Sequence, residues 1–156
     1  MKILALTTVL WLLSVSAFAG PQIRSFSSGS YQQIVSHQQQ VFVMVFWSLD
    51  CPPCYKELEM LGRFSKQYPA IKLVLVSTDI SVSKNEILAV LTKYQLENTE
   101  SWVFTGNSEE RLRFEIDVTW YGELPRSYLI KHSEQIQVVS GVLEEAKLIK
   151  MLSDYQ

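Results

Sequence analysis

The sequence has little of the chemistry that would assign it to several large classes of protein. Its 156 residues include only two cysteines and two histidines, and 14 Lys and Arg nearly balance 16 Asp and Glu. It has no basic block and no interleaving of aromatic with basic residues, so nothing indicates nucleic-acid binding. The histidines, His37 and His132, do not form a ligand-spaced pair, and we expect no metal. The length suffices for one domain.

One long apolar stretch stands at the amino terminus. Lys2 provides a small positive region, residues 3–15 are almost entirely apolar, and Ala17-Phe18-Ala19 has the small residues of a signal-peptidase site. We therefore expect residues 1–19 to be a cleaved signal peptide that exports the chain. The alternative is an uncleaved membrane anchor over residues 3–19, which is close to the shortest length that spans a bilayer.

Alternating apolar runs predict a layered α/β domain over residues 30–156, preceded by a flexible leader at residues 20–29. Continuous apolar runs predict buried strands at residues 41–47, 71–77 and 102–104. Helical periodicity and capping serines predict helices at residues 30–39, 54–68, 83–94 and 143–152, with a short one after Ser108. Strands at residues 126–130 and 135–139, joined by four polar residues, predict an antiparallel hairpin and hence a mixed sheet.

The strongest signal is Cys51-Pro52-Pro53-Cys54, which stands where a predicted strand gives way to a predicted helix. A disulfide there closes a very small loop and removes little unfolded-state entropy, so it would be a poor structural staple. The helix N-terminus stabilises a thiolate, the reactive form of cysteine. We expect Cys51 to be exposed and nucleophilic, and Cys54 to be more buried and to resolve the mixed disulfide. A structural disulfide and a metal site are the alternatives.

Two segments of the chain form a recognisable pair: Phe46-Trp47-Ser48-Leu49-Asp50-Cys51-Pro52-Pro53-Cys54 and Tyr121-Gly122-Glu123-Leu124-Pro125-Arg126-Ser127-Tyr128-Leu129-Ile130. They resemble the thioredoxin superfamily, and within it the TlpA/ResA branch of exported thiol–disulfide oxidoreductases, which includes CcmG/DsbE-related proteins. The first segment is similar to the family's strand running into W-C-P-P-C, and the second is similar to its Y-G-x-x-P-x-x-F-L-I segment. The resemblance implies a thioredoxin-like three-layer domain, a mixed central sheet flanked by helices on both faces. It also implies no cofactor beyond the redox-active disulfide, and we expect a monomer.

The resemblance implies roles for residues outside the dithiol. Pro125 matches the family's cis proline, so the Leu124–Pro125 bond is predicted to be cis and the backbone of Leu124 to position an extended client segment. The alternative is that Pro125 merely starts a strand. Glu57 matches a glutamate that influences proton transfer, and a partly buried carboxylate there could accept a proton from Cys54. The alternative is a solvated glutamate in the first helical turn.

The chain departs from the family pattern near the dithiol. Asp50 replaces the tryptophan that usually precedes the first cysteine, and an acid there opposes thiolate formation. Val45 stands where cytosolic-type thioredoxins carry a buried aspartate, which makes Glu57 the candidate proton acceptor. The residues expected to shape the site are Trp47, Asp50, Pro52 and Pro53.

We therefore expect a periplasmic reductase of client-protein disulfides, for instance those of apocytochrome c during haem attachment. By resemblance, its electron donor would be a membrane thiol transporter of the DsbD/CcdA kind. A DsbA-like oxidant that forms disulfides is the alternative enzyme, and its reduction potential would distinguish it. A non-catalytic thioredoxin-like binding module is the alternative outside the enzymes.

Overall fold

The computed structural model describes residues 21–106 and 108–155, so the predicted signal peptide at residues 1–19 lies outside the described residues. The strands are β1 (Ile23–Phe26), β2 (Phe42–Trp47), β3 (Lys72–Ser77), β4 (Glu100–Phe104), β5 (Arg126–Lys131) and β6 (Glu134–Ser140). The helices are α1 (Ser30–His37), α2 (Pro52–Gln67), α3 (Lys84–Lys93), α4 (Glu109–Ile116) and α5 (Glu145–Ser153). None of these helices is both long and apolar enough to cross a membrane.

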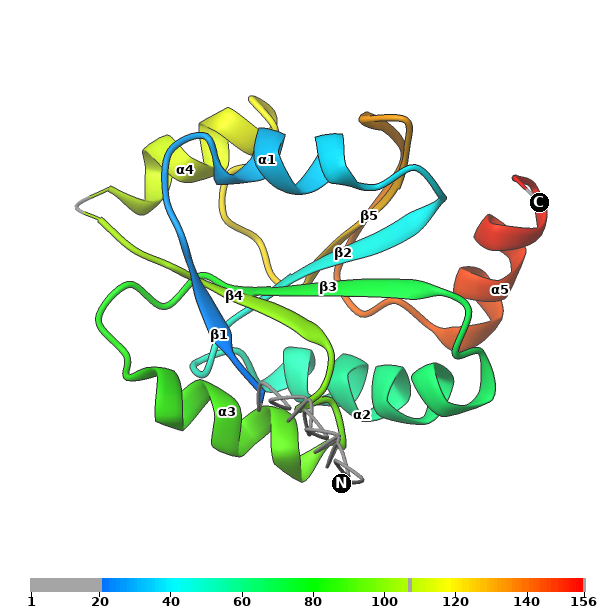
Figure 1. Ribbon diagram of the computed structural model, residues 1–156, viewed down its shortest axis with the longest axis horizontal. Coiled ribbons are helices and arrows are strands. Elements are labelled where there is room, and N and C mark those ends of the chain that lie inside the picture. The colour runs from blue at the N-terminus through cyan, green and yellow to red at the C-terminus, as the bar shows by residue number, and fades with distance from the viewer. Residues whose placement is uncertain (1–20, 107, 156) are drawn as a thin grey trace, which may run out of the picture.

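A single mixed sheet forms the middle layer, with helices on both of its faces, as Figure 1 shows. Its strand order is β1-β4-β3-β2-β5-β6. The first four strands in that order run parallel, whereas β5 runs antiparallel to β2 and β6 antiparallel to β5. The predicted three-layer α/β architecture is confirmed. Because β2 lies between β3 and β5, its end is enclosed by neighbouring strands.

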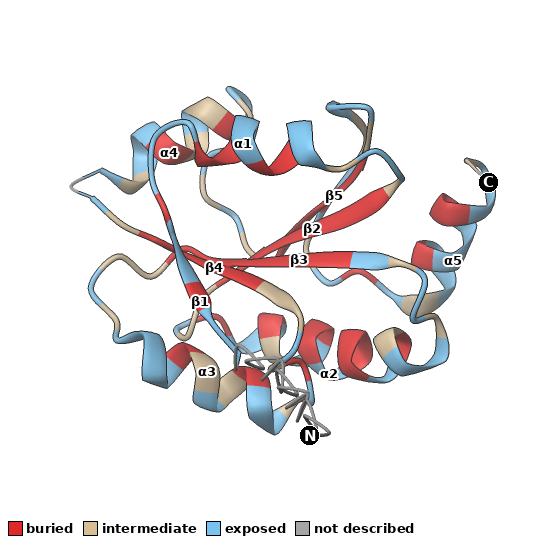
Figure 2. Cartoon of the chain, in the orientation of Figure 1, coloured by how far each residue is buried: buried red, intermediate tan, exposed pale blue. Residues whose placement is uncertain are grey.

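Each face of the sheet has its own hydrophobic core because side chains alternate along every strand. All six residues of β2 are buried, which explains its continuous apolar sequence (Figure 2). Val43, Val45 and Trp47 face the core made with α2, α3 and α5. The other three residues, Phe42, Met44 and Phe46, face the core made with α1 and α4.

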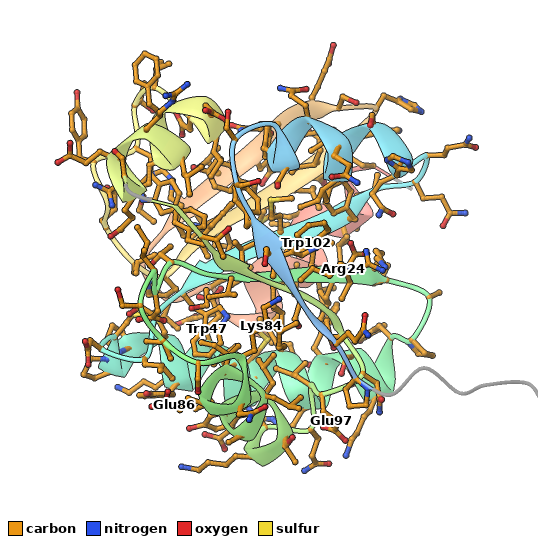
Figure 3. All side chains as sticks on the ribbon, turned by 60° about the vertical axis from the view of Figure 1, so that its left-hand side comes forward. Arg24, Trp47, Lys84, Glu86, Glu97 and Trp102 are labelled. Atoms are coloured by element: carbon orange, nitrogen blue, oxygen red, sulfur yellow. A yellow bond between two sulfur atoms is a disulfide. The ribbon has the colours of Figure 1, made fainter. Side chains whose placement is uncertain are left out.

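The predicted flexible leader is wrong for β1, which pairs in parallel with β4 at the edge of the sheet. Ile23 and Phe26 are its buried residues, and they belong to different cores. Their spacing gives neither alternation nor a continuous apolar run, which is why the sequence pattern did not indicate a strand. Between them Arg24 reaches over the ring of Trp102 on β4, as Figure 3 shows, with 5.4 Å from guanidinium carbon to ring centroid.

Serine side chains begin two helices as predicted. The Ser83 hydroxyl accepts a hydrogen bond from the Glu86 amide, and the Glu86 carboxylate accepts one from the Ser83 amide, which completes a capping box. Ser108 caps α4 in the predicted way. Ser30 differs, because it is the first residue of α1 and its hydroxyl accepts from the amide of Ser27 before the helix.

The hairpin between β5 and β6 is tighter than predicted. Lys131 pairs with Glu134, so the turn contains only His132 and Ser133 rather than four residues. Both turn residues have positive φ, 50° and 67°. A two-residue turn with two positive φ angles matches the twist of the strands that it joins.

Phe26 provides a test of β1 as part of the domain. Its buried ring lies 5.0 Å from that of Phe104 and 6.4 Å from those of Phe46 and Trp102, measured between centroids. Phe26→Ala should lower the free energy of unfolding by about 3–5 kcal/mol in urea denaturation, because it leaves a cavity among these rings. Ser25→Ala, at an exposed position of the same strand, is the control. Equal stability of the two variants would contradict the assignment.

Candidate active site

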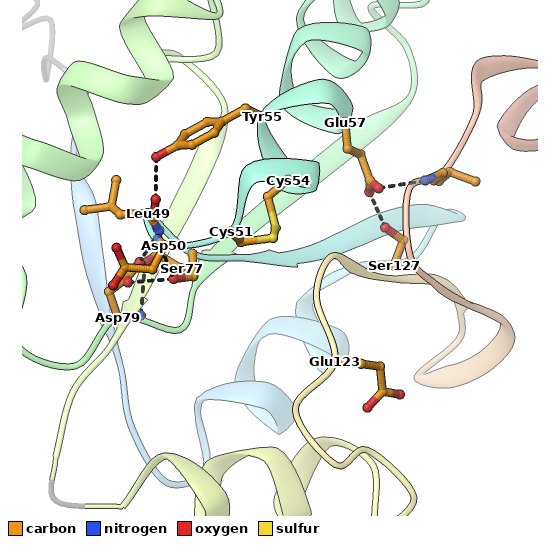
Figure 4. Close-up of a disulfide and its surroundings, with 12 residues drawn as sticks. Leu49, Asp50, Cys51, Cys54, Tyr55, Glu57, Ser77, Asp79, Glu123 and Ser127 are labelled. Carbon is orange, nitrogen blue, oxygen red and sulfur yellow. Dashed lines mark hydrogen bonds between the residues drawn. A yellow bond between two sulfur atoms is a disulfide. The ribbon is translucent and has the colours of Figure 1, made fainter.

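A disulfide between Cys51 and Cys54 lies where β2 gives way to α2 (Figure 4). Cys51 is the N-cap residue of α2, and its carbonyl accepts a hydrogen bond from the amide of Cys54 at 2.9 Å. Pro52 and Pro53 form the first two positions of the helix, where an amide hydrogen is not needed. The helix therefore begins at Pro52, two residues earlier than predicted. The two sulfurs lie at its N-terminal end, where the helix dipole favours a negative charge.

The two cysteines differ in exposure in the expected order, but both are more enclosed than predicted. Cys54 is completely buried, and Cys51 exposes only 7% of its surface, so the expectation of an exposed Cys51 is wrong in degree. Both belong to the core cluster that contains Trp47, and the partly buried Leu49 and Leu124 pack against this cluster. The loops that carry these leucines are far apart in sequence. A partner molecule can therefore reach the disulfide only at the small exposed surface of Cys51.

The loop before Cys51 is held by Asp79, which follows the end of the neighbouring strand β3. One carboxylate oxygen of Asp79 accepts from the Ser48 hydroxyl at 2.8 Å, and the other accepts from the Leu49 amide at 3.0 Å and the Ser77 hydroxyl at 2.6 Å. Tyr55 adds a hydrogen bond from its hydroxyl to the Leu49 carbonyl at 2.5 Å. Both polar groups of the Leu49 backbone are thus held in place.

The Glu57 carboxylate is fully buried on the sheet side of α2. One oxygen accepts from the Ser127 hydroxyl at 2.5 Å, and the other accepts from the Leu143 amide at 2.7 Å. Figure 4 shows Glu57 and the disulfide projecting from the same helix towards the sheet. Burial raises the pKa of Glu57 above its ordinary 4.5, and the two hydrogen bonds offset only part of that effect. The solvated alternative for Glu57 is wrong.

The sheet register explains why Ser127 reaches Glu57. Val45 on β2 pairs with Ser127 on β5, and Val45 faces the core under α2. Paired residues on adjacent strands point to the same face, so the Ser127 hydroxyl also points towards α2. Val45 is apolar and offers no carboxylate at the position where cytosolic-type thioredoxins carry a buried aspartate. Glu57 provides the buried carboxylate in this region instead.

The segment that enters β5 approaches the same end of the sheet. The Leu124–Pro125 peptide is cis, and Arg126 pairs with Phe46, one residue before the end of β2. The Pro125 carbonyl accepts from the Gly141 amide at 2.9 Å. No hydrogen bond to the backbone N–H or C=O of Leu124 is found within the described part of the chain. The backbone N–H and C=O of Leu124 therefore have no partner among the described residues.

The remaining predicted site residues differ in how they contribute to the site. Trp47 is buried beneath the disulfide loop in the core shared with both cysteines. Asp50 is exposed, and its amide donates a hydrogen bond to the Ser48 hydroxyl at 3.1 Å. Within residues 21–106 and 108–155, no three His, Cys, Asp or Glu side chains gather as a metal site would require. The prediction of a site without metal or cofactor stays a prediction.

Sequence analysis missed three groups that hold the site: Asp79, Ser127 and the amide of Leu143. One signal was available for Asp79. Ser48 follows β2, and Ser77 is the last residue of β3. These two strands are parallel neighbours, so their carboxyl ends meet at one edge of the sheet. The partnership of Glu57 with Ser127 and Leu143 had no comparable signal, because 70 and 86 residues separate the partners.

No protein-family model matches the chain, and no curated protein matches it. Among solved structures, it is similar to a secreted disulfide oxidoreductase of Mycobacterium tuberculosis described as homologous to Escherichia coli DsbE. The two are 18% identical with a TM-score of 0.58, over 75% of this chain and 83% of the other. It is also similar to StoA from Bacillus subtilis, at 22% identity and a TM-score of 0.55, over 74% and 84%. Thioredoxin f2 of Chlamydomonas reinhardtii is 13% identical with a TM-score of 0.52, over 86% of this chain and 97% of the other. The chain has the thioredoxin-like fold that the resemblance implied.

The buried Glu57 should make stability depend on pH. A carboxyl group whose pKa is raised by folding binds more protons when folded, so the free energy of unfolding falls as pH rises from the unfolded value of 4.5 towards the folded one. Glu57→Gln removes this effect and can still accept from Leu143 and donate to Ser127. The stability of the oxidised variant relative to wild type should therefore increase from pH 4 to pH 7, as measured by urea denaturation.

Glu59→Gln, at an exposed position of the same helix, is the control for that measurement. Its stability relative to wild type should show no comparable increase. A flat difference between Glu57→Gln and wild type across this pH range would contradict the raised pKa of Glu57.

Asp79 should determine how firmly the loop before Cys51 is held. Asp79→Ala removes the acceptor of the Leu49 amide, and we expect the exchange of that amide hydrogen to accelerate by about tenfold, with a global cost of about 1–3 kcal/mol. Asp79→Asn retains one acceptor oxygen and should show a smaller acceleration. Unchanged protection of Leu49 in the alanine variant, measured by hydrogen exchange, would show that Asp79 does not hold this loop.

Proposed function

We propose that this chain is an exported thiol–disulfide oxidoreductase that reduces disulfides of client proteins through Cys51 and Cys54. One observation carries the proposal. The disulfide at the start of α2 presents the edge of Cys51 to solvent, encloses Cys54, and has a buried carboxylate on the same helix. This asymmetry matches a chemistry in which one sulfur meets the partner and the other acts only within the protein.

The first step transfers the client from its own disulfide to Cys51. With the pair reduced, the Cys51 thiolate attacks one client sulfur, forming a Cys51–client disulfide and breaking the client's own bond. The released client sulfur leaves as a thiolate and takes a proton from water. The N-terminus of α2 favours the thiolate form of Cys51 because the helix dipole stabilises negative charge there.

The second step releases the client and needs a base for the enclosed Cys54. The Cys54 thiol loses its proton, and its sulfur attacks Cys51, which forms the Cys51–Cys54 disulfide and expels the client as a second thiolate. Two electrons have then passed to the client. Glu57 is the candidate proton acceptor, since it is buried on the same helix and its raised pKa suits a carboxylate that takes up a proton.

The cis peptide segment supplies a place for the client backbone. The free N–H and C=O of Leu124 can pair with an extended client segment as the edge of a sheet would. Such pairing depends on the backbone and tolerates different client sequences. It would bring a client cysteine to the exposed edge of Cys51.

Export and the redox partners are also part of the proposal. The signal-peptide pattern of residues 1–19 supports export to the periplasm, where a dithiol stays reduced only if a donor supplies electrons. A membrane thiol transporter of the DsbD/CcdA kind would be that donor, and apocytochrome c is a candidate client. The similar Mycobacterium tuberculosis protein is described as a secreted disulfide oxidoreductase, which agrees with this assignment.

Insulin reduction tests the activity. Wild-type protein kept reduced by dithiothreitol should reduce insulin disulfides more than about 100-fold faster than Cys51→Ser, which lacks the attacking sulfur. Cys54→Ser should instead accumulate a mixed disulfide through Cys51, which non-reducing electrophoresis detects. If wild type and Cys51→Ser have equal rates, the chain is not a reductase and the binding-module alternative gains support.

A further inference from the structure

The loop of residues 117–124, between α4 and β5, carries the peptide that would receive the client, yet it contains no helix or strand. Val118 and Tyr121 are 64% and 89% exposed, so apolar burial of these side chains does not fix the loop. Trp120 of the same loop is buried: its ring centroid lies 4.8 Å from that of Phe46 on β2, and its indole N–H donates to the Glu123 carbonyl at 3.0 Å. This packing holds the middle of the loop against the sheet, whereas the ends of the loop, at Asp117 and Glu123, are held by polar contacts.

Arg126, the first residue of β5, makes those contacts. Its guanidinium donates to the Asp117 carboxylate at 2.6 Å, to the Glu123 carboxylate at 2.5 Å and to the Tyr128 hydroxyl at 3.0 Å. It also donates to the Ser140 hydroxyl on β6. One side chain therefore joins both ends of the loop to two strands of the sheet.

The contacts of Arg126 with Asp117 are largely shielded from solvent, so water competes little for these hydrogen bonds. The side chains of Arg126 and Asp117 are 9% and 12% exposed, whereas that of Glu123 is 41% exposed. Burial alone would raise the pKa of Asp117, but hydrogen bonds from Thr119, Arg126 and Tyr128 outweigh it and lower that pKa. Asp117 is thus ionised at neutral pH, and a planar guanidinium fixes the direction of each bond that it donates.

Side chains alternate between the two faces of the sheet along β5. The Arg126 side chain therefore lies next to the proposed redox site but on the other face of the sheet. Arg126 and Tyr128 point to the face covered by α1 and α4, whereas Ser127 points to the opposite face and binds Glu57. Pro125 directly precedes Arg126, so the cis peptide is one residue from the anchored side chain.

We propose that Arg126 is a positioning residue, which holds the 117–124 loop so that the free backbone of Leu124 lies where a client segment can pair with it. The inference rests on the proposed function, because it concerns how that client is received. Arg126 would affect exchange with protein disulfides, which need the loop. It would not affect exchange with a small dithiol, which needs only the exposed edge of Cys51.

The test compares two reactions of the same variant. Arg126→Met removes the five donors and keeps the apolar stem, and it should lower the rate constant for insulin reduction by the reduced protein about tenfold, as misplacement of a binding group does. The rate constant for reduction of its own disulfide by dithiothreitol should stay within about twofold of wild type. Arg63→Met, which breaks an exposed ion pair with Glu59 on α2, is the matched control and should change neither rate.

Glu123→Ala keeps the test valid if Arg126→Met fails to fold, because Glu123 is partly exposed and its loss leaves the Arg126–Asp117 pair intact. We expect a selective loss of insulin reduction of about threefold in that variant. Equal loss of both rates, or no loss of either, in the folded variants would overturn the role of Arg126. Failure of wild type to reduce insulin would instead overturn the proposed function itself.

Discussion

A carboxylate removed from water connects the parts of this molecule that surround the Cys51–Cys54 disulfide. Glu57 on α2 accepts one hydrogen bond from Ser127 on β5 and one from the amide of Leu143 before α5. Burial of a charge is costly unless each oxygen has a donor, so these bonds fix the spacing of three elements. The same burial raises the pKa of Glu57 and gives the site a group suited to receiving a proton. Burial of Glu57 therefore underlies both the spacing of these elements and the proposed proton transfer.

The sequence predicted those features of the fold that depend on local pattern. The continuous apolar run of β2 indicated a strand buried on both faces, and the serine and glutamate of the α3 capping box indicated where that helix begins. The dithiol between a strand and a helix was equally readable, because its meaning depends on adjacent residues. The order of exposure of Cys51 and Cys54 followed from their positions at the start of the helix.

Features that depend on tertiary contacts could not be predicted in the same way. β1 has two buried residues that face opposite cores, so its pattern carries no period. Cys51 is more enclosed than expected because it is part of the hydrophobic core that residues of β2, α2 and α5 build together. The sequence could place Glu57 near the dithiol, but only its distant partners decide that it is buried. The polar anchors on Asp79 and Arg126 likewise join segments that the sequence keeps apart.

The most direct test of the account is the reduction potential of the Cys51–Cys54 pair, measured by equilibrating the protein with glutathione buffers and trapping free thiols by alkylation. A reductase in an oxidising compartment requires a dithiol that readily gives up its electrons, and the acid at Asp50 opposes the thiolate stabilisation of a strong oxidant. We predict a reversible couple with a potential below about −200 mV. A potential near the value of about −120 mV found for a strong disulfide-forming oxidant, or a disulfide that cannot be reduced in the folded protein, would contradict the account.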